Sequence, residues 1–172
     1  MKTGIEKFKN VIDSDTCDLL IKHLEDNLHH SMDLTHNDRQ NVICKEITLQ
    51  PHTEIDNVVY KVIVKVVELY KEKYPTFEVR GDTGYQLRKI TGNTKQHIDN
   101  ISKDHRNVSI ILGLNSDYEK GEFHFPYQDF STTVKRGEAI VFPVYFMYPH
   151  FVDAPIGNRY TINTWMTCNL NY

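Results

Sequence analysis

Hydrophobic residues recur every three to four positions in two stretches of the first half of the chain, 13–28 and 53–74. This spacing puts the apolar side chains on one face of a helix, so each stretch predicts an amphipathic helix. Asp13 or Ser14 can cap the first helix with a side-chain oxygen, and Pro75 ends the pattern of the second.

The remaining residues are patterned for loops and strands. Residues 29–41 are polar and aperiodic, which predicts a loop, and residues 42–49 resemble a short strand. After Pro75, short segments rich in β-branched and aromatic residues alternate with turn residues. The strands expected there are 83–90, 95–99, 107–114, 122–125, 130–134, 139–142, 150–154 and 159–168. Eight such strands favour an antiparallel sandwich or barrel.

These elements predict a single α+β domain, mainly β, over residues 1–172. The chain has 172 residues, of which 40% are hydrophobic and 25% charged, the usual mixture for one globular domain. We expect residues 1–75 to form a helical support, with both helices packed on one sheet, and residues 76–172 to form the β core. A core of this size is stable without a structural metal, so any bound metal would serve function.

Charge and cysteine content narrow the class of protein. The net charge is −3 and the basic residues are scattered, so no nucleic-acid partner is expected. The 3 cysteines lie far apart, which argues against a disulfide framework and fits a cytoplasmic location. Residues 1–17 lack the apolar run of a signal peptide. Charged residues interrupt the longest apolar stretch, 58–70, so no membrane partner is expected.

Histidine and aspartate two positions apart can share one face of a strand and bind one metal ion. The sequence has two such triplets, His36-Asn37-Asp38 and His97-Ile98-Asp99. The first lies in the polar loop, where a solvated histidine is the simpler interpretation, and we set it aside. The second lies in a predicted strand whose opposite face, at Ile98, can enter the core. It is the candidate metal site, with a surface histidine beside an aspartate as the alternative.

Two further groups for such a site follow near the end of the chain. A predicted strand carries His150, and the return strand after a turn carries Arg159, so both side chains can reach one pocket. Two histidines and one carboxylate leave three positions open on a divalent metal, an arrangement suited to non-haem Fe(II). The fork of Arg159 is suited to binding the far carboxylate of an organic acid by two parallel hydrogen bonds.

Seven segments in the second half of the chain carry a resemblance to a known family. They are Tyr-Gln-Leu-Arg-Lys-Ile at 85–90, His97-Ile98-Asp99, 108–115 ending in Leu114-Asn115, Gly-Glu-Phe-His-Phe-Pro at 121–126, Gly-Glu-Ala-Ile-Val-Phe-Pro at 137–143, His150, and Arg159-Tyr160 followed by Trp165. In this order they resemble the motifs of the Fe(II)- and 2-oxoglutarate-dependent dioxygenases, in the prolyl 4-hydroxylase-like branch. The resemblance extends over residues 83–172.

The resemblance implies a double-stranded β-helix, which is a jelly roll of eight strands with iron at its mouth. The metal ligands that it implies are His97, Asp99 and His150. It also implies that Arg159 binds 2-oxoglutarate, and Thr161, two positions later on the same face, is a candidate to add its hydroxyl. Trp165 falls where related enzymes line the substrate side, with an ordinary core aromatic as the alternative.

The sequence departs from the family pattern at the co-substrate pocket. Relatives often have tyrosine where this chain has Ile90, and Tyr85 is no simple substitute because it lies on the opposite face of the strand. Some relatives also carry tyrosine at the position of Gly113. Ser109, four residues earlier on the same face, is a substitute donor to 2-oxoglutarate. These departures concern how oxoglutarate is held and leave the predicted iron ligands unchanged.

The function implied by the resemblance is hydroxylation of a C–H bond, with 2-oxoglutarate converted to succinate and CO2. The cofactors are Fe(II), 2-oxoglutarate and O2, with ascorbate as a candidate reductant. The leading substrate that the resemblance implies is a prolyl residue in a peptide or protein. Only the short segment 100–106 separates the Asp99 strand from the next, so we expect an open groove that can admit a polypeptide loop. A free amino acid or another small molecule is the alternative substrate. A non-catalytic jelly-roll binding module is the alternative from a different class.

Overall fold

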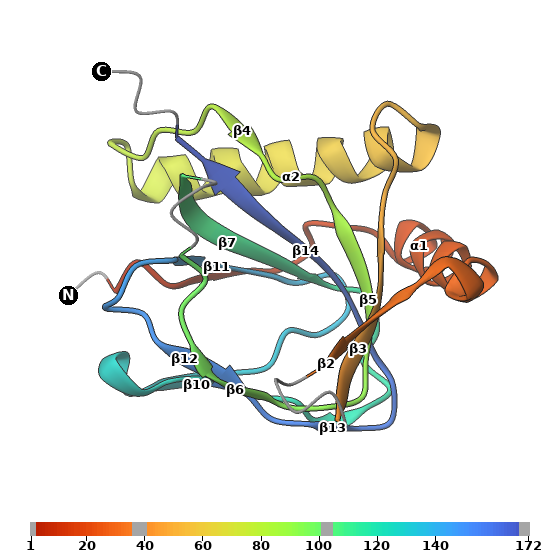
Figure 1. The fold of residues 1–172 in the computed structure, drawn as a ribbon. Coiled ribbons are helices and arrows are strands. Elements are labelled where there is room, and N and C mark those ends of the chain that lie inside the picture. Colours follow the sequence, from red (N-terminus) through yellow and green to blue (C-terminus); the bar gives the residue numbers. More distant parts are fainter. Residues whose placement is uncertain (1–2, 36–40, 101–104, 169–172) are drawn as a thin grey trace.

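The structure is a computed structural model that describes residues 3–35, 41–100 and 105–168 (Figure 1). The helices in these ranges are α1 (Ser14–Asp26) and α2 (Glu54–Lys73), with the 3-10 helices η1 (Leu28–His30) and η2 (Pro126–Gln128). The strands are β1 (Glu6–Phe8), β2 (Met32–Thr35), β3 (Val42–Thr48), β4 (Gly81–Asp82), β5 (Gln86–Ile90), β6 (Thr94–His97), β7 (Arg106–Gly113), β8 (Glu119–Lys120), β9 (Phe123–Phe125), β10 (Phe130–Thr132), β11 (Ala139–Pro143), β12 (His150–Val152), β13 (Pro155–Ile156) and β14 (Arg159–Thr167).

The strands form two main antiparallel sheets. The larger sheet has 8 strands in the order β1-β11-β7-β14-β5-β3-β2, with β4 paired to β14. The smaller sheet has 4 strands in the order β10-β9-β12-β6. One hydrophobic cluster joins the two, with Ile111 and Phe142 from the larger sheet in contact with Phe123 and Phe125 from the smaller. The protein is therefore mainly β, as the pattern of short strands predicted.

Both helices contribute to a second hydrophobic cluster on the other face of the larger sheet. Leu20 and Leu24 of α1 and Ile63 of α2 are buried in this cluster together with Leu87 of β5 and Leu112 of β7. Figure 1 shows α2 running alongside the larger sheet. Because β-branched residues are weak helix formers, burial of this apolar face stabilises α2 more than intrinsic propensity does. Within the described ranges, no helix is long and apolar enough to cross a membrane.

Side-chain caps start both helices, and the cap of α1 is one of the two residues that the sequence predicted. The Asp13 carboxylate accepts a hydrogen bond from the Thr16 backbone N–H at 2.8 Å, and the Thr53 hydroxyl accepts one from Asp56 at 3.3 Å. Of the two caps considered for the first helix, Asp13 is the one used. Each bond satisfies a backbone donor that has no partner within its helix.

Each of the eight strands predicted after Pro75 has a counterpart in the structure, with shortened or shifted ends. The prediction that residues 29–41 form a loop was wrong in part. That segment contains η1 and β2, and β2 pairs with β3. β2 lies at the edge of the larger sheet with its side chains exposed or half buried, so no hydrophobic alternation marks it in the sequence. His36 and Asp38, the triplet that we set aside, lie outside the described residues.

The strand that carries His97 ends earlier than predicted. Because β6 ends at His97, Asp99 follows the strand instead of lying in it. Ile98 is 38% exposed, so the expectation that it enters the core was wrong. His97 and Asp99 nevertheless line the same cavity.

Gly113, at the end of β7, has no room for a side chain. A Cβ there would lie 2.4 Å from the carbonyl oxygen of Lys135 and 2.6 Å from that of Val134, which excludes the tyrosine that some relatives carry. We expect Gly113→Ala to lower the free energy of unfolding by about 2 kcal/mol, because the backbone must shift to relieve the overlap.

Gly81→Ala is the control, because a Cβ at Gly81 would meet only the Thr167 hydroxyl, at 3.5 Å. We expect it to change the free energy of unfolding by less than about 0.5 kcal/mol. Urea denaturation of both variants measures the difference, and equal losses would contradict the steric explanation for Gly113.

Candidate metal centre

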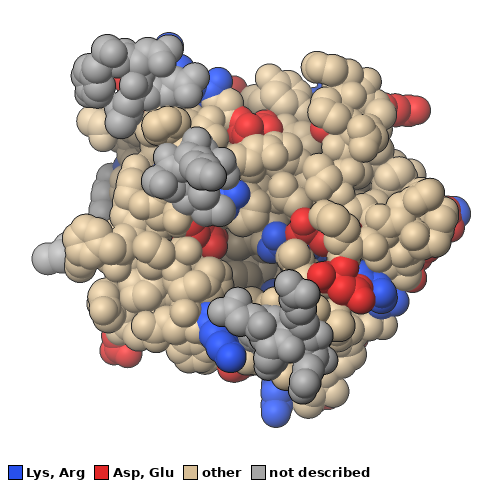
Figure 2. All heavy atoms as spheres, in the orientation of Figure 1, with Lys and Arg blue, Asp and Glu red and all other residues tan. Residues whose placement is uncertain are grey.

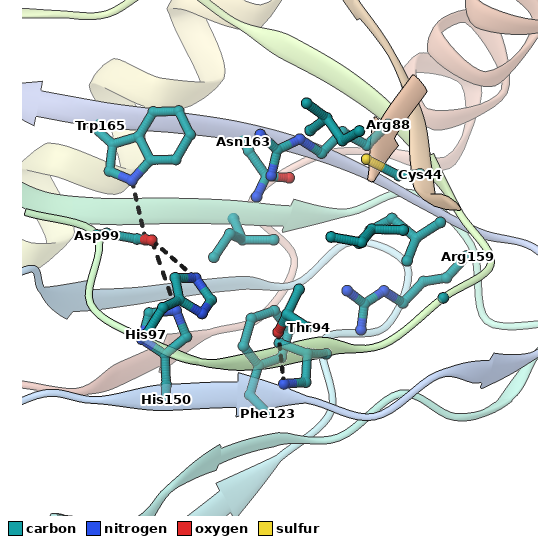
Figure 3. Close-up of a pocket in the computed structure, with 16 residues that line it drawn as sticks. Cys44, Arg88, Thr94, His97, Asp99, Phe123, His150, Arg159, Asn163 and Trp165 are labelled. Carbon is teal, nitrogen blue, oxygen red and sulfur yellow. Dashed lines mark hydrogen bonds and ion pairs between the residues drawn. The ribbon is translucent and has the colours of Figure 1, made fainter. Parts of the chain in front are cut away.

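The structure brings together the three side chains that the sequence predicted as metal ligands. His97, Asp99 and His150 each offer one ligand atom, and these atoms lie within 4.8 Å of one another. His97 at the end of β6 is paired in register with His150 at the start of β12, so the two imidazoles lie side by side. The Asp99 Oδ1 atom lies 3.3 Å from the His97 Nε2 atom and 3.8 Å from the His150 Nε2 atom (Figure 3).

Backbone carbonyls fix which nitrogen of each imidazole faces Asp99. The Nδ1 atom of His97 lies 2.8 Å from the Lys95 carbonyl oxygen, and that of His150 lies 3.2 Å from the Tyr148 carbonyl oxygen. A carbonyl can only accept, so each Nδ1 donates and each Nε2 is left with a lone pair toward Asp99. Three acceptor atoms then converge, and a cation is needed to neutralise their repulsion. The donor set therefore fits Fe(II).

The second oxygen of Asp99 is held by two donors from the larger sheet. The Ser109 hydroxyl donates to Asp99 Oδ2 at 2.6 Å, and the Trp165 indole N–H donates to the same atom at 3.0 Å. Burial raises the pKa of Asp99, but its interactions with His97 and His150 and the hydrogen bonds from Ser109 and Trp165 together lower it well below its usual value. Asp99 is therefore ionised, with Oδ1 turned toward the histidines.

The histidines differ in how their surroundings affect protonation. The hydrogen bond that a protonated His97 donates to Asp99 raises the pKa of His97, whereas burial lowers the pKa of His150, which is 3% exposed. His150 therefore presents a neutral imidazole, the form that binds a metal ion.

The three ligands lie in a cavity of about 230 Å³ between the two sheets. The residues lining it are Leu34, Ile43, Cys44, Arg88, Ile90, Gly92, Thr94, His97, Asp99, Ile111, Phe123, His150, Val152, Arg159, Asn163 and Trp165. Figure 2 shows a hollow in this face of the molecule, with acidic and basic side chains around it. Arg159 and Trp165 lie toward opposite ends of the cavity in Figure 3.

Arg159 is a buried cation that lacks a carboxylate partner among the described residues. It is 3% exposed, one Nη donates to the Gly121 carbonyl oxygen at 2.7 Å, and its Nε has no hydrogen-bond partner there. Burial lowers the pKa of Arg159 to about 10, so the guanidinium remains charged at neutral pH. A buried charge of this kind requires an anion, and the carboxylate of an organic acid that enters the cavity fits that requirement.

The backbone beside Arg159 leaves space for its guanidinium. Gly121 has a φ of +76°, and a Cβ at this position would lie 3.2 Å from an Arg159 Nη atom. Glycine therefore satisfies both the left-handed backbone and the close approach.

The other predicted donors to oxoglutarate have different partners in the structure. The Ser109 hydroxyl bonds Asp99 and so supports the metal ligand. The Thr161 hydroxyl is fully buried, is not among the cavity-lining atoms, and donates to the Asn163 side-chain oxygen at 2.7 Å. Tyr85 bonds Asp82 in the cluster behind the larger sheet, as its position on the opposite strand face predicted. Ile90 lines the cavity and supplies no hydroxyl.

Trp165 has two roles that its sequence position left open. It lines the cavity, and its indole N–H orients Asp99. The Arg106 guanidinium lies 3.9 Å from the centre of its ring, which places a cation at this end of the cavity.

Sequence reasoning assigned no role to several polar residues of the cavity, chiefly Asn163, Arg88 and Thr94. A signal for two of them was present, because side chains two apart in a strand share a face. Asn163 lies between Thr161 and Trp165 in this alternation, and Arg88 shares its face with Ile90. Thr94 accepts a hydrogen bond from the Val152 backbone N–H at 2.9 Å, a contact between β6 and β12 that no local pattern indicates.

Comparison with known proteins agrees with this geometry. Residues 85–167 match the sequence model of the 2OG-Fe(II) oxygenase superfamily. A comparison with curated protein sequences gives no match.

Several solved structures share the fold of the whole chain. The viral collagen prolyl hydroxylase of Paramecium bursaria Chlorella virus-1, in its 2OG complex, is 18% identical with a TM-score of 0.76, covering 95% of each chain. A Pseudomonas putida prolyl-4-hydroxylase is 15% identical with a TM-score of 0.76, covering 97% of this chain and 94% of that one. A Trichoplax adhaerens prolyl hydroxylase, in complex with a peptide fragment of the hypoxia inducible factor oxygen degradation domain, is 16% identical with a TM-score of 0.75, covering 96% of this chain and 84% of that one. The two antiparallel sheets thus match a jelly-roll oxygenase fold.

The family match and the donor set together fix the class of the protein. Residues 85–167 match the 2OG-Fe(II) oxygenase superfamily, and the fold of the chain is like that of the prolyl hydroxylases. The protein is a 2-oxoglutarate-dependent dioxygenase whose cofactors are Fe(II), 2-oxoglutarate and O2, and the His97, Asp99 and His150 triad fits the iron.

We expect Ser109→Ala to weaken Fe(II) binding by about tenfold, because removal of one donor to Oδ2 leaves the Asp99 carboxylate free to rotate. The measurement is an anaerobic Fe(II) titration followed by the fluorescence of Trp165, the chain's 1 tryptophan, whose indole bonds Asp99.

Ser131→Ala is the control, because its hydroxyl also bonds a histidine, His124, but on the β9–β10 pair outside the cavity. It should bind Fe(II) as the wild type does. An unchanged affinity in Ser109→Ala would show that Trp165 alone holds the carboxylate.

Proposed function

We propose that this dioxygenase hydroxylates a prolyl residue of a peptide or protein and converts 2-oxoglutarate to succinate and CO2. The observation that carries the reaction is that one cavity holds both the triad and the Arg159 guanidinium, which has no carboxylate partner among the described residues. The prolyl substrate is supported by the fold likeness to prolyl hydroxylases, of which one was solved with a peptide fragment.

The residues of this chain divide the work between the two ends of the cavity. His97, Asp99 and His150 would hold Fe(II), which with 2-oxoglutarate and O2 supplies the oxidising power to hydroxylate an unactivated C–H bond. Arg159 binds the carboxylate of 2-oxoglutarate that is far from the iron, using donors that no described residue occupies. This assignment gives the buried charge the counter-ion that it lacks.

Apolar side chains keep water away from these groups. Ile90, Ile111, Phe123 and Val152 line the cavity that also holds Arg159 and the histidines. In this low-dielectric setting the attraction between guanidinium and carboxylate is stronger than in water. Ile90 thus contributes exclusion of water where relatives contribute a hydroxyl.

Asn163 is the donor that we propose in place of Thr161. The Thr161 hydroxyl donates to the Asn163 side-chain oxygen, which orients the amide and leaves its NH2 group as a donor in the cavity. Thr161 is then a positioning residue that acts through Asn163.

The proposal is tested by incubating the protein with Fe(II), 2-oxoglutarate and either proline-containing peptides or free proline. We expect peptides to gain one oxygen atom with one succinate formed per product, measured by mass spectrometry and a succinate assay. Oxygen transfer to free proline alone would replace the peptide substrate with a small molecule. Product formation without 2-oxoglutarate would contradict the reaction.

We expect Arg159→Gln to raise the KM for 2-oxoglutarate by at least about tenfold, because it removes the charged donors while the triad is untouched. Steady-state succinate formation at varied 2-oxoglutarate measures this. Arg136→Gln is the control, since Arg136 pairs with Asp18 on α1, away from the cavity. If both variants had the wild-type KM, Arg159 would have no part in binding the co-substrate.

A further inference from the structure

A second arginine, Arg88, lies in the same cavity and has no role in the function described so far. It is on β5, on the strand face that it shares with Ile90, and it lines the cavity with the metal ligands. Its guanidinium carbon lies 5.7 Å from the centre of the Trp165 ring, and Figure 3 shows its side chain toward Trp165 and Asn163. The Arg88 guanidinium thus lies between Trp165 and Arg159, and burial together with the charge of Arg88 lowers the pKa of Arg159.

A buried carboxylate holds Arg88 in this position. Glu46 lies directly across from Arg88 in the pairing of β3 with β5, and the Arg88 Nε donates to the Glu46 carboxylate at 2.6 Å. Glu46 is only 7% exposed, and it is not among the residues that line this cavity. It therefore supports Arg88 from behind, where a ligand in the cavity does not reach it.

The pairing with Glu46 leaves part of the guanidinium available. Among the described residues, only Glu46 bonds Arg88, and it does so through Nε. The two terminal nitrogens are therefore free to donate, on a side chain that is 19% exposed. Because its partner also fixes the side chain, little rotamer entropy remains to be lost when a ligand binds.

The two arginines of the cavity are suited to different acceptors. Arg159 has no anionic partner and needs a carboxylate. Arg88 is already neutralised by Glu46, so its remaining donors suit an uncharged oxygen, such as a carbonyl. A peptide carries such a carbonyl on each side of a prolyl ring.

We propose that Arg88, held by Glu46, is a substrate-specificity residue that donates to a main-chain carbonyl oxygen next to the hydroxylated proline. This inference rests on the proposed peptide substrate. It assigns the Trp165 end of the cavity to the polypeptide backbone and the Arg159 end to the co-substrate.

The first experiment measures binding without turnover. The enzyme is loaded with Mn(II) and 2-oxoglutarate, and a proline-containing peptide that the wild type hydroxylates is titrated in by calorimetry. We expect Arg88→Gln to weaken peptide binding by about ten- to a hundredfold, and to change 2-oxoglutarate binding by less than about twofold.

Lys89→Gln is the matched control. Lys89 is the neighbouring residue on β5, carries the same charge, and lies on the other strand face, where it pairs with Glu25 at 3.0 Å. It should bind the peptide as the wild type does. Arg88→Lys is the second variant, since it retains a charge beside Glu46 but loses the fork, and we expect it to weaken peptide binding as well.

The second experiment identifies the acceptor. Each of the two carbonyls that flank the proline is replaced in turn by a thioamide, whose sulfur is a weaker acceptor. We expect one of the two replacements to weaken binding to the wild type and to have no further effect on Arg88→Gln, the signature of a direct contact in a double-mutant cycle.

Distinct outcomes overturn distinct statements. Equal peptide affinity in Arg88→Gln, Arg88→Lys and the wild type, or a loss of 2-oxoglutarate binding in place of peptide binding, overturns the role of Arg88 while the proposed function stands. If the thioamide weakens peptide binding to Arg88→Gln as much as it weakens binding to the wild type, the carbonyl is not the acceptor of Arg88. A wild type that binds free proline and no peptide overturns the proposed function itself, and this inference with it.

Discussion

The site depends on one buried carboxylate whose two oxygens have different partners. Oδ2 of Asp99 accepts from Ser109 and Trp165, and Oδ1 faces His97 and His150. Because both donors bond the same oxygen, rotation of the carboxylate would break two hydrogen bonds at once and leave buried donors unsatisfied. The orientation of the metal-binding oxygen is therefore decided by residues that do not touch the metal.

Two guanidinium groups in one small cavity would repel each other if neither had an anionic partner. In this structure one of them, Arg88, has such a partner. Glu46 neutralises Arg88, so the only uncompensated buried charge of the pair is that of Arg159. The field inside the cavity is thereby directed toward one end. An anion is attracted to the Arg159 end, and the Trp165 end is left for groups that bind by shape and hydrogen bonding.

The sequence predicted much of this architecture because its signals are local. Helical spacing and turn residues indicate elements whatever their partners. The His97-Ile98-Asp99 triplet is likewise visible in the sequence alone, although the strand that carries His97 ends before Asp99. What could not be predicted depends on contacts between distant segments. Thr161 was expected at the co-substrate, but its neighbour Asn163 takes its hydroxyl, and period two alone does not say which of two groups on one face reaches the ligand. β2 was missed because an edge strand needs no apolar face.

The metal ligands and their supports come from opposite sheets. His97 and His150 lie on β6 and β12, whereas Ser109 and Trp165, which hold Asp99, lie on β7 and β14. The complete donor set exists only when the two layers are docked, so an unfolded chain presents no such site. An ion that binds only the native state raises the free energy of unfolding and lowers the fraction of unfolded molecules. Iron availability in the cell would then influence the protein's lifetime against proteolysis as well as its turnover.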